Sequence, residues 1–542
     1  MKSIIVAASI FLFSFVLLAQ HPAGSPLTFK RMRNASEEPQ NWLMYWGNYQ
    51  GTHYSSLNQI DKTNVDRLQI SWMMPMTGVA SLQSTPLVVD GVMYTSGVPG
   101  TIYALDAKTG VQIWKYERAQ KTRNPNGSNP FNRGVAVMGN SVFAGTLDAA
   151  LIALDRTTGR LVWETQVADT MMGYSITQSP LVVKDKLIVG VAGGEFGIRG
   201  FIDAYDLKSG KLLWRFNAIP GPGEFGNDTW KGDSWMRGGS PMWLTGSYDP
   251  QLNTVYWAVG NPGPQIDRSV RGDGDNLFSD SVIAIDPDTG TRKWHYQFTP
   301  NDGHDWDSAQ ALVLVDRVWH GQPRRLLMHA DRNGMFYVLD RTDGRFLAAT
   351  PFVYQNWNSG FDTNGRPRVV LGSNSSAEGS FFVYPTLGGG TNFQAPSYSA
   401  LTGLFYLAYS ENGQRYVSQP AAFEQGRQYI GRGQAGPASP RAGEPPASSG
   451  IKAIDPETGA TKWDFKTAQG SLQNGVLATA GNVLFASIRD GNLAALDAGT
   501  GAQLWHFQTG TTPAASPMSY AVAGKQYVAI AAGNTIYAFA LP

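Results

Sequence analysis

The sequence of 542 residues contains no cysteine and few charged residues. Without cysteine the chain can form no disulfide, no thiolate zinc site and no cysteine nucleophile. It also lacks the Cys-x-x-Cys-His motif that attaches a c-type haem. Charged residues make up 16 % of the chain and the formal net charge is +1, so there is no basic field to hold nucleic acid. We expect no nucleic-acid partner.

Long apolar runs are also missing, apart from one at the N-terminus. Lys2 precedes an apolar stretch at residues 4–18, and small residues follow at Ala19 and Ala23. This order is typical of a secretory signal peptide, and the apolar core is short for a membrane span. We predict that residues 1–23 are a signal peptide with its cleavage region and that the protein is periplasmic, with no stable membrane anchor. An uncleaved N-terminal anchor is the alternative.

The chain is rich in one internal repeat. The phrase Ala-x-Asp-x-x-Thr-Gly-x-x-x-Trp first spans residues 104–114 and recurs at 153–163. Five further copies, of which the one at Asp340 has lost its Trp, are centred on Asp206, Asp286, Asp340, Asp455 and Asp497. Repetition at roughly 40–50 residues is typical of propellers and solenoids.

Each copy of the phrase predicts a β-hairpin. The residues before the Asp alternate as a half-buried strand does, the Asp can accept turn N–H groups, and the Gly can adopt a left-handed conformation. The Trp begins the next strand and offers a flat face to a neighbouring sheet. With 61 glycines and 12 % aromatic residues, the chain is predicted to be all-β: an eight-bladed β-propeller with tryptophan-docking repeats.

The spacing of the repeats predicts the domain organisation. Residues 24–40 are expected to be an irregular lead-in, and residues 41–542 a single propeller domain. The interval between Asp340 and Asp455 is about twice the usual one, so we expect a blade without the phrase there, with a strand at residues 404–407. The last strand, at 535–541, is expected to close the ring against N-terminal strands.

Polar residues between the repeats suggest chemistry beyond a scaffold. Glu195 and Asn261 each follow an expected strand end, and Asp305 lies in a polar cluster at residues 301–307. Side-chain oxygens from separate blades can converge on the propeller axis, and a hard cation prefers such ligands. Each residue taken alone can also be a turn-stabilising polar group.

The chain resembles the quinoprotein alcohol dehydrogenases, the pyrroloquinoline quinone (PQQ) enzymes that include methanol dehydrogenase. The resemblance covers nearly the whole chain after the N-terminal apolar run. It is strongest in four segments: Ile176-Thr177-Gln178-Ser179-Pro180, Gly193-Gly194-Glu195-Phe196-Gly197-Ile198-Arg199-Gly200, Gly260-Asn261-Pro262-Gly263-Pro264 and Asp331-Arg332-Asn333-Gly334.

The resemblance implies a metal centre. Glu195 and Asn261 match residues that bind a metal ion in contact with PQQ. Asp305 matches the catalytic base, and we expect it to bind the metal as well. Asp307 matches a carboxylate that marks lanthanide-dependent members, since a trivalent ion is better balanced by one more anion. We expect a lanthanide, with calcium as the alternative; Asp307 facing solvent is the other interpretation.

The resemblance also implies a set of cofactor-binding residues. Trp243 matches the indole on which the quinone stacks, and Arg332 a catalytic cation near the quinone oxygens. Arg133 and Thr177 match groups that hold PQQ carboxylates, for which an arginine fork is well suited. The remaining matched positions are Gln83, Gly193, Gly194 and Asn392.

The implied reaction is oxidation of a small alcohol to an aldehyde. The metal polarises the quinone carbonyl, Asp305 takes the hydroxyl proton, and hydride passes to PQQ. Without a haem motif, the electrons are expected to leave to a soluble cytochrome c. The adjacent cysteines and longer C-terminal tail of many relatives are missing, which predicts an open mouth and a substrate other than methanol. A sugar or polyol dehydrogenase and a non-enzymatic propeller are the alternatives, and a homodimer is left open.

Overall fold

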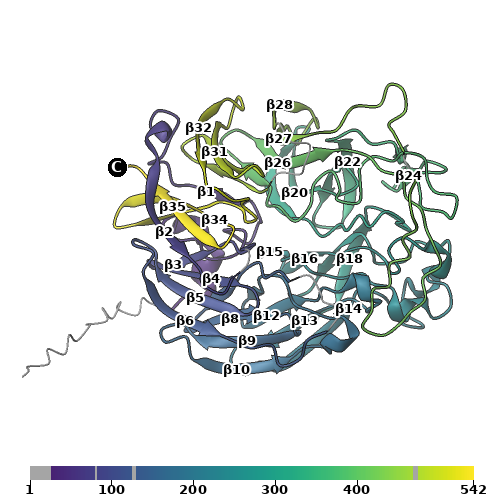
Figure 1. Ribbon diagram of the computed structural model, residues 1–542, viewed down its shortest axis with the longest axis horizontal. Helices are drawn as coiled ribbons and strands as arrows, with labels where there is room; N and C mark the ends of the chain where they lie inside the picture. The colour runs from purple at the N-terminus through teal and green to yellow at the C-terminus, as the bar shows by residue number, and fades with distance from the viewer. Residues whose placement is uncertain (1–25, 80–81, 125–129, 437, 468–473) are drawn as a thin grey trace, which may run out of the picture.

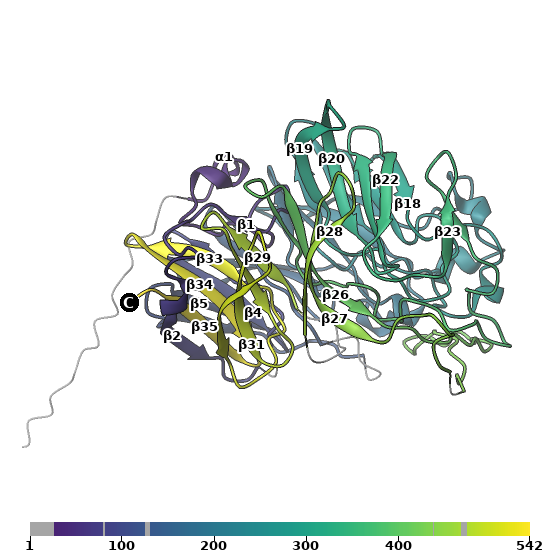
Figure 2. The ribbon, with the colours of Figure 1, turned by 90° about the horizontal axis from the view of Figure 1, so that it is seen from above.

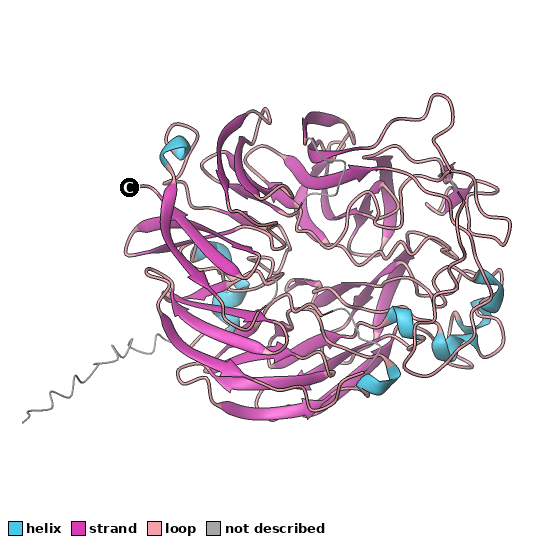
Figure 3. Ribbon diagram, in the orientation of Figure 1, coloured by secondary structure: helices cyan, strands magenta, loops and turns pink. Residues whose placement is uncertain are grey.

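The computed structural model describes residues 26–542 except 80–81, 125–129, 437 and 468–473. The predicted signal peptide therefore lies outside the described residues. The chain forms a ring of β-sheets with a few short helical turns (Figures 1 and 3). No helix in the described part of the chain is long and apolar enough to cross a membrane.

The described strands build eight propeller blades of four strands each, as predicted, and a separate β-hairpin. Blades 1 to 3 are made of β3 (Leu87–Val89), β4 (Val92–Gly97), β5 (Thr101–Asp106) and β6 (Gln112–Glu117); β7 (Ala136–Met138), β8 (Ser141–Gly145), β9 (Ala150–Asp155) and β10 (Leu161–Gln166); and β11 (Leu181–Val183), β12 (Lys186–Gly190), β13 (Phe201–Asp206) and β14 (Leu212–Asn217). Blades 4 to 6 are made of β15 (Ser247–Asp249), β16 (Thr254–Ala258), β17 (Ser281–Ile285) and β18 (Arg292–Gln297); β19 (Val313–Trp319), β20 (Gln322–Ala330), β21 (Met335–Asp340) and β22 (Arg345–Pro351); and β25 (Ser397–Ser399), β26 (Leu404–Glu411), β27 (Ser448–Ile454) and β28 (Thr461–Lys466). Blade 7 is made of β29 (Val476–Thr479), β30 (Val483–Ser487), β31 (Asn492–Asp497) and β32 (Gln503–Gln508), with the short β1 (Tyr54–Ser55) added at its edge, and the separate hairpin is β23 (Asn358–Phe361) with β24 (Pro367–Val369).

Blade 8 joins the two ends of the described chain. It combines β2 (Gln69–Pro75) with β33 (Met518–Val522), β34 (Lys525–Ala532) and β35 (Thr535–Ala540). Strands β2 and β35 pair antiparallel and lie on the same side of the ring in both ribbon views (Figures 1 and 2). The prediction that the last strand closes the ring against an N-terminal strand is confirmed.

The repeated phrase forms the contact between successive blades. In blade 1 the indole N–H of Trp114 donates to the carbonyl oxygen of Arg156 at 2.9 Å. Its ring lies over Gly159 of blade 2, where a Cβ would be 2.7 Å from the indole and φ is +70°. Asp155 accepts N–H groups of the same turn, including that of Thr158 at 2.8 Å. The Trp-to-Gly contact recurs in the pairs Trp163–Gly210, Trp214–Gly290, Trp294–Gly344 and Trp463–Gly501.

The predicted place of the blade without the phrase is wrong. Blades 5 and 6, which carry Asp340 and Asp455, are consecutive in the chain. The extra length lies in the connection that holds β23 and β24 and in a second insertion between β26 and β27. The blade without the phrase is blade 8, where Trp72 on β2 supplies the indole that covers Gly110 of blade 1. The strand expected at 404–407 is the first half of β26.

The segment before the ring is more regular than predicted. The expected irregular lead-in contains α1 (Phe29–Arg33), whose N-cap Thr28 accepts the N–H of Arg31, and a turn of 3₁₀-helix, η1 (Ala35–Glu37). Six more 3₁₀ turns are η2 (Val65–Arg67), η3 (Thr170–Met172), η4 (Gly194–Phe196), η5 (Asn227–Thr229), η6 (Ser234–Arg237) and η7 (Arg268–Val270).

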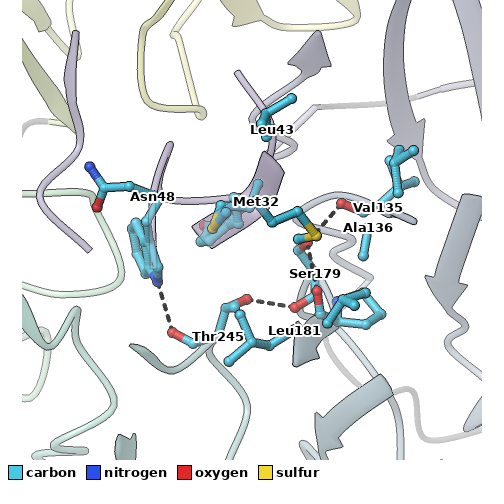
Figure 4. Close-up of a pocket in the computed structure, with 14 residues that line it drawn as sticks. Met32, Leu43, Asn48, Val135, Ala136, Ser179, Leu181 and Thr245 are labelled. Carbon is cyan, nitrogen blue, oxygen red and sulfur yellow. Dashed lines mark hydrogen bonds between the residues drawn. The ribbon is translucent and has the colours of Figure 1, made fainter. Parts of the chain in front are cut away.

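The chain after the lead-in packs tightly against blades 2 to 4. The indole N–H of Trp46 donates to the carbonyl oxygen of Thr245 at 2.9 Å, and the Thr245 hydroxyl donates to the carbonyl oxygen of Ser179 at 2.6 Å. A pocket of only about 10 Å³ remains among these residues (Figure 4). That volume is close to the minimum of roughly 10–15 Å³ needed for one water molecule, so this pocket is not the ligand site.

Candidate active site

A larger cavity, of about 230 Å³, lies where the loops of blades 2 to 6 meet. Its walls come from loops that precede the first strand of a blade or join the second and third strands. Residues far apart in the sequence are thereby brought together. Ten of the twelve predicted site residues line it: Arg133, Thr177, Gly193, Gly194, Glu195, Trp243, Asn261, Asp307, Arg332 and Asn392.

A buried cation lies between aromatic rings on one side of the cavity. The guanidinium carbon of Arg133 is 4.8 Å from the ring centres of both Trp243 and Phe393. One guanidinium nitrogen donates to the Thr177 hydroxyl at 2.9 Å, while Nε is buried without a partner among the described residues. Burial, and then the charge of Arg332, lower the pKa of Arg133 to about 10. An anionic group placed here would stabilise the charged guanidinium of Arg133 and accept a hydrogen bond from its Nε.

Asp307 is held inside the cavity wall. Its Oδ1 accepts the backbone N–H of Asn261 at 2.8 Å, and its Oδ2 lies 3.1 Å from Nη2 of Arg332. A Cβ at Gly260 would be 2.0 Å from Oδ1 of Asp307, so only glycine leaves room for this carboxylate. Asp307 is 6 % exposed, and the interpretation that it faces solvent is wrong.

Glu195 faces the same cavity from η4. Burial first, and the charge of Asp307 in addition, raise the pKa of the Glu195 carboxyl above its usual range. The amide Nδ2 of Asn261 donates to the carbonyl oxygen of Pro262 at 2.9 Å. The amide Oδ1 of Asn261 then lies toward Gly194, next to Glu195, at 3.3 Å from the place of a Cβ on that glycine. Two carboxylates and an amide oxygen therefore face one cavity.

Asp305 and Gln83 are the two predicted residues that are not among those lining the described cavity. Asp305 is nevertheless adjacent to it, because its carbonyl oxygen accepts Nη1 of Arg332 at 2.7 Å. Burial, followed by the charges of Asp307 and Glu195, raises the pKa of the Asp305 carboxyl well above its usual range. Gln83 has a buried Oε1 without a hydrogen-bond partner in the described chain.

The donor set suits a hard cation, although it does not form a closed cage. Among the described residues no three acidic or histidine side chains converge tightly enough to make a metal site by themselves. The carboxylates of Glu195 and Asp307 and the amide of Asn261 are the oxygen ligands that calcium-sized ions prefer. Burial and the nearby charge of Asp307 disfavour the ionised form of Glu195, and a bound cation would stabilise that form. The residues present therefore fit a metal ion and an adjoining anionic ligand.

The cavity also contains residues that sequence reasoning missed. They are Phe131, Ser175, Ala192, Pro241 and Phe393. Each of them lies one or two positions from a predicted site residue in the sequence. That closeness in the sequence is the signal by which they could have been predicted. Three of the five are aromatic or proline side chains, which give the predicted polar site part of an apolar wall.

Comparison with known proteins places the chain in a family. The family model for the β-propeller domain of glucose/ethanol/alcohol dehydrogenases that use PQQ matches residues 42–351, more than half of the chain. The chain belongs to the PQQ-dependent alcohol dehydrogenase family. A second model, that of the outer membrane protein assembly factor BamB, matches only residues 447–541, which carry two copies of the repeated phrase.

Individual relatives agree with this family. The quinoprotein alcohol dehydrogenase PedH of Pseudomonas putida is 38 % identical over 97 % of this chain and 92 % of its own length. The crystal structure of the quinohemoprotein alcohol dehydrogenase from Comamonas testosteroni superposes with a TM-score of 0.89 at 33 % identity, covering 95 % of this chain and 82 % of the other. A europium-containing methanol dehydrogenase gives 0.88 at 31 % identity, covering 94 % and 100 %. This member of the PQQ-dependent alcohol dehydrogenases is therefore an oxidoreductase, as predicted.

Proposed function

We propose that the protein is a periplasmic dehydrogenase that oxidises a small alcohol to an aldehyde with PQQ and one metal ion in the described cavity, and that it passes the electrons to a soluble cytochrome c. The observation that supports this most directly is that ten predicted site residues, from five blades, line one cavity. Bound PQQ would supply the two-electron oxidant, and the ion a Lewis acid.

Each wall of the cavity has a separate task in this proposal. Arg133 and Thr177 hold the carboxylates of PQQ, because the buried guanidinium has a free donor. Trp243 offers its indole face to the flat ring system. Glu195, Asn261 and Asp307 bind the ion through oxygen atoms, as suits a hard cation.

Asp305 is the proposed base that takes the hydroxyl proton of the alcohol. Burial and the neighbouring carboxylates raise the pKa of its carboxyl, so a cation in the adjoining cavity would favour the ionised form that a base requires. Arg332 fixes the Asp305 backbone through the carbonyl oxygen and also reaches Asp307. It therefore couples the base to the ion-binding wall, and its charge can stabilise developing negative charge nearby.

The ion is proposed to be a lanthanide, with calcium as the alternative. Asp307 adds a second carboxylate beside Glu195, and more negative charge favours a trivalent ion over a divalent one. The likeness to a europium-containing methanol dehydrogenase supports the same choice.

Substitution of the base tests the mechanism. We expect Asp305→Asn, loaded with PQQ and metal, to keep its cofactor spectrum and metal content while turnover falls by a factor of roughly 100 or more, in line with loss of a general base. The control is Asp288→Asn, at an exposed turn of blade 4. Near-normal turnover of Asp305→Asn would reject the base, and absence of a PQQ spectrum in wild-type protein would reject the cofactor site.

The substrate class needs a separate test. Phe131, Phe393, Pro241 and Trp243 give the cavity apolar walls, which favour an alcohol with an apolar chain over a polyol. Comparison of kcat/KM for a series of primary alcohols, glycerol and glucose decides between them. A preference for glucose or glycerol would support the sugar or polyol dehydrogenase alternative.

A further inference from the structure

We propose that Asp302 is a positioning residue for Asp305, because its buried carboxylate fixes the backbone on both sides of the base. The proposal rests on the proposed role of Asp305 in catalysis. Asp302 lies outside the cavity, with 0 % of its side chain exposed, so it cannot contact the substrate. Its influence has to pass through the chain from residue 302 to residue 306.

Three donors converge on the Asp302 carboxylate. Oδ1 accepts the backbone N–H of His304 at 3.0 Å and faces Nδ1 of the same histidine at 2.9 Å. Oδ2 accepts the backbone N–H of Trp306 at 3.0 Å. The two backbone groups belong to the residues immediately before and after Asp305. A single carboxylate therefore closes a loop whose apex is the base.

The loop is anchored on its inner side. The imidazole of His304 is stacked on the indole of Trp306, with 3.9 Å between ring centres and an interplanar angle of 12°. The second ring nitrogen of His304 lies 2.8 Å from the carbonyl oxygen of Ser373, so both ring nitrogens face acceptors. The fully buried Arg271 donates to the carbonyl oxygen of Asp302 at 2.6 Å. The alternate residues 302, 304 and 306 are thus packed inside the protein.

Asp305 itself has a backbone conformation that needs such support. Its φ is +67°, in the left-handed region that non-glycine residues rarely adopt. A conformation of this kind persists where the surroundings over-determine it. Three hydrogen bonds support it here. The backbone N–H groups of His304 and Trp306 donate to the Asp302 carboxylate, and Arg332 donates to the carbonyl oxygen of Asp305.

The chemistry of the acceptor explains why the residue is an aspartate. Both carboxylate oxygens accept a backbone N–H at once, and burial, which alone would raise the pKa of Asp302, is outweighed by the hydrogen bond with His304 and the other donors, so the pKa is lowered. An asparagine keeps the shape but offers one acceptor oxygen and turns an NH₂ toward the other N–H. Asp302→Asn therefore breaks one of the two backbone bonds and leaves the packing volume unchanged.

The experiment has two independent readouts. In metal-free and cofactor-free protein, hydrogen exchange at the backbone amides of His304 and Trp306 is expected to be faster in Asp302→Asn and in Asp302→Ala than in the wild type. In loaded protein, we expect kcat to fall by roughly 10- to 100-fold because a misplaced catalytic group is costly. KM, metal content and the PQQ spectrum stay unchanged, and the primary deuterium isotope effect rises.

Asp249→Asn is the matched control. Asp249 is also buried, with 3 % exposed, and accepts the backbone N–H groups of Gln251 and Leu252 in a turn of blade 4. It pairs with Arg341 of blade 5. We expect it to lower the unfolding temperature without changing kcat or exchange at Trp306.

Three outcomes would overturn the proposal: unchanged exchange and kcat in both Asp302 variants, parallel loss of metal and PQQ, or failure of both variants to fold, since the last two assign Asp302 to general stability. Failure of the proposed function is recognised separately. In that case Asp305→Asn keeps its turnover, while exchange at Trp306 still reports on the loop.

Discussion

The carboxylate of Asp307 occupies the space that a side chain on residue 260 would fill. Gly260 therefore allows a second negative charge to face the cavity. Oδ1 is fixed by the N–H of Asn261 and Oδ2 by Arg332, so the carboxylate faces the same space as Glu195. A residue at this position without charge would leave Glu195 as the only carboxylate among the residues lining the described cavity.

Removal of that charge should change which ion binds. We expect Asp307→Asn, which keeps an oxygen for the Asn261 N–H, to weaken lanthanum binding to the metal-free protein by roughly 10- to 100-fold, the range typical of altered metal-site partners. Calcium binding should weaken less, because a divalent ion gains less from the second negative charge. Titration calorimetry with both ions measures the difference, and equal losses for the two ions would contradict the role given to Asp307.

Resemblance in short motifs could identify the residues lining the cavity, but the structure was needed for those acting behind it. Arg133, Glu195 and Asn261 lie in matched segments, so their positions were predictable. Asp302 lies in the same polar cluster as Asp305, yet nothing in the sequence shows that its carboxylate accepts the N–H groups of residues 304 and 306. Side-chain-to-backbone bonds of this kind depend on loop conformation, which a short polar stretch leaves open.

At the scale of the hairpin, the glycine of the repeated phrase has two separate requirements. Gly159 needs a φ of +70°, and it also needs the absence of a Cβ because the Trp114 ring lies above it. Gly91, in the tight turn between β3 and β4, has a φ of +81° but nothing within 4 Å of the place of a Cβ. The pair therefore separates backbone strain from inter-blade packing.

We expect Gly91→Ala to lower the free energy of unfolding by about 1 kcal/mol, from left-handed strain alone. Gly159→Ala should lower it by about 2–4 kcal/mol, because the methyl group also displaces the indole. Chemical denaturation of both variants measures the values. Equal losses would mean that the Trp114 ring adapts freely and that the phrase does not determine blade contact.

The hairpins were predictable from the phrase, whereas the insertions were not. The spacing between Asp340 and Asp455 indicated an extra blade. In the structure, the additional residues form β23, β24 and the connection between β26 and β27. Interval length counts residues without distinguishing strands from loops. The closure by the last strand was predicted, but blade 8 was not recognised as the blade without the phrase, because its indole, Trp72, comes from the other end of the sequence.

At the scale of the whole molecule, His53 links the segment before the ring to the last blade. Its Nε2 lies 2.8 Å from the carbonyl oxygen of Pro517, and its Nδ1 is buried without a partner in the described structure. Burial lowers the pKa of His53 from 6.5 to about 4. The folded protein therefore holds a neutral imidazole that the unfolded chain would protonate first.

The sign of the effect follows from that difference. Above pH 6.5 both states are neutral and the full stability is present; as the pH falls toward about 4, the unfolded chain gains the proton first and stability is lost. The loss attributable to His53 is at most about 3 kcal/mol. We expect His53→Asn, which tolerates the φ of +45° at this position, to lose less stability than the wild type between pH 7 and pH 4.

Denaturant titrations of both proteins at the two pH values measure this difference. His295, whose pKa burial and then Arg292 lower to about 4 as well, is common to both proteins and cancels in the comparison. Identical pH dependence of the free energy of unfolding in the two proteins would show that protonation of His53 does not destabilise the folded protein.

The blade shared by β2 and β33–β35 has a consequence for biogenesis. During synthesis, β2 has no pairing partner until β35 is made, because Pro75 pairs with Thr535, more than 450 residues later in the chain. A nascent chain released early would expose an unmatched sheet edge at each extremity, and such edges recruit other strands. The ring of this protein can therefore close only after its final hairpin, β34–β35, has been synthesised. Truncation before that hairpin should yield aggregates in place of a smaller ring.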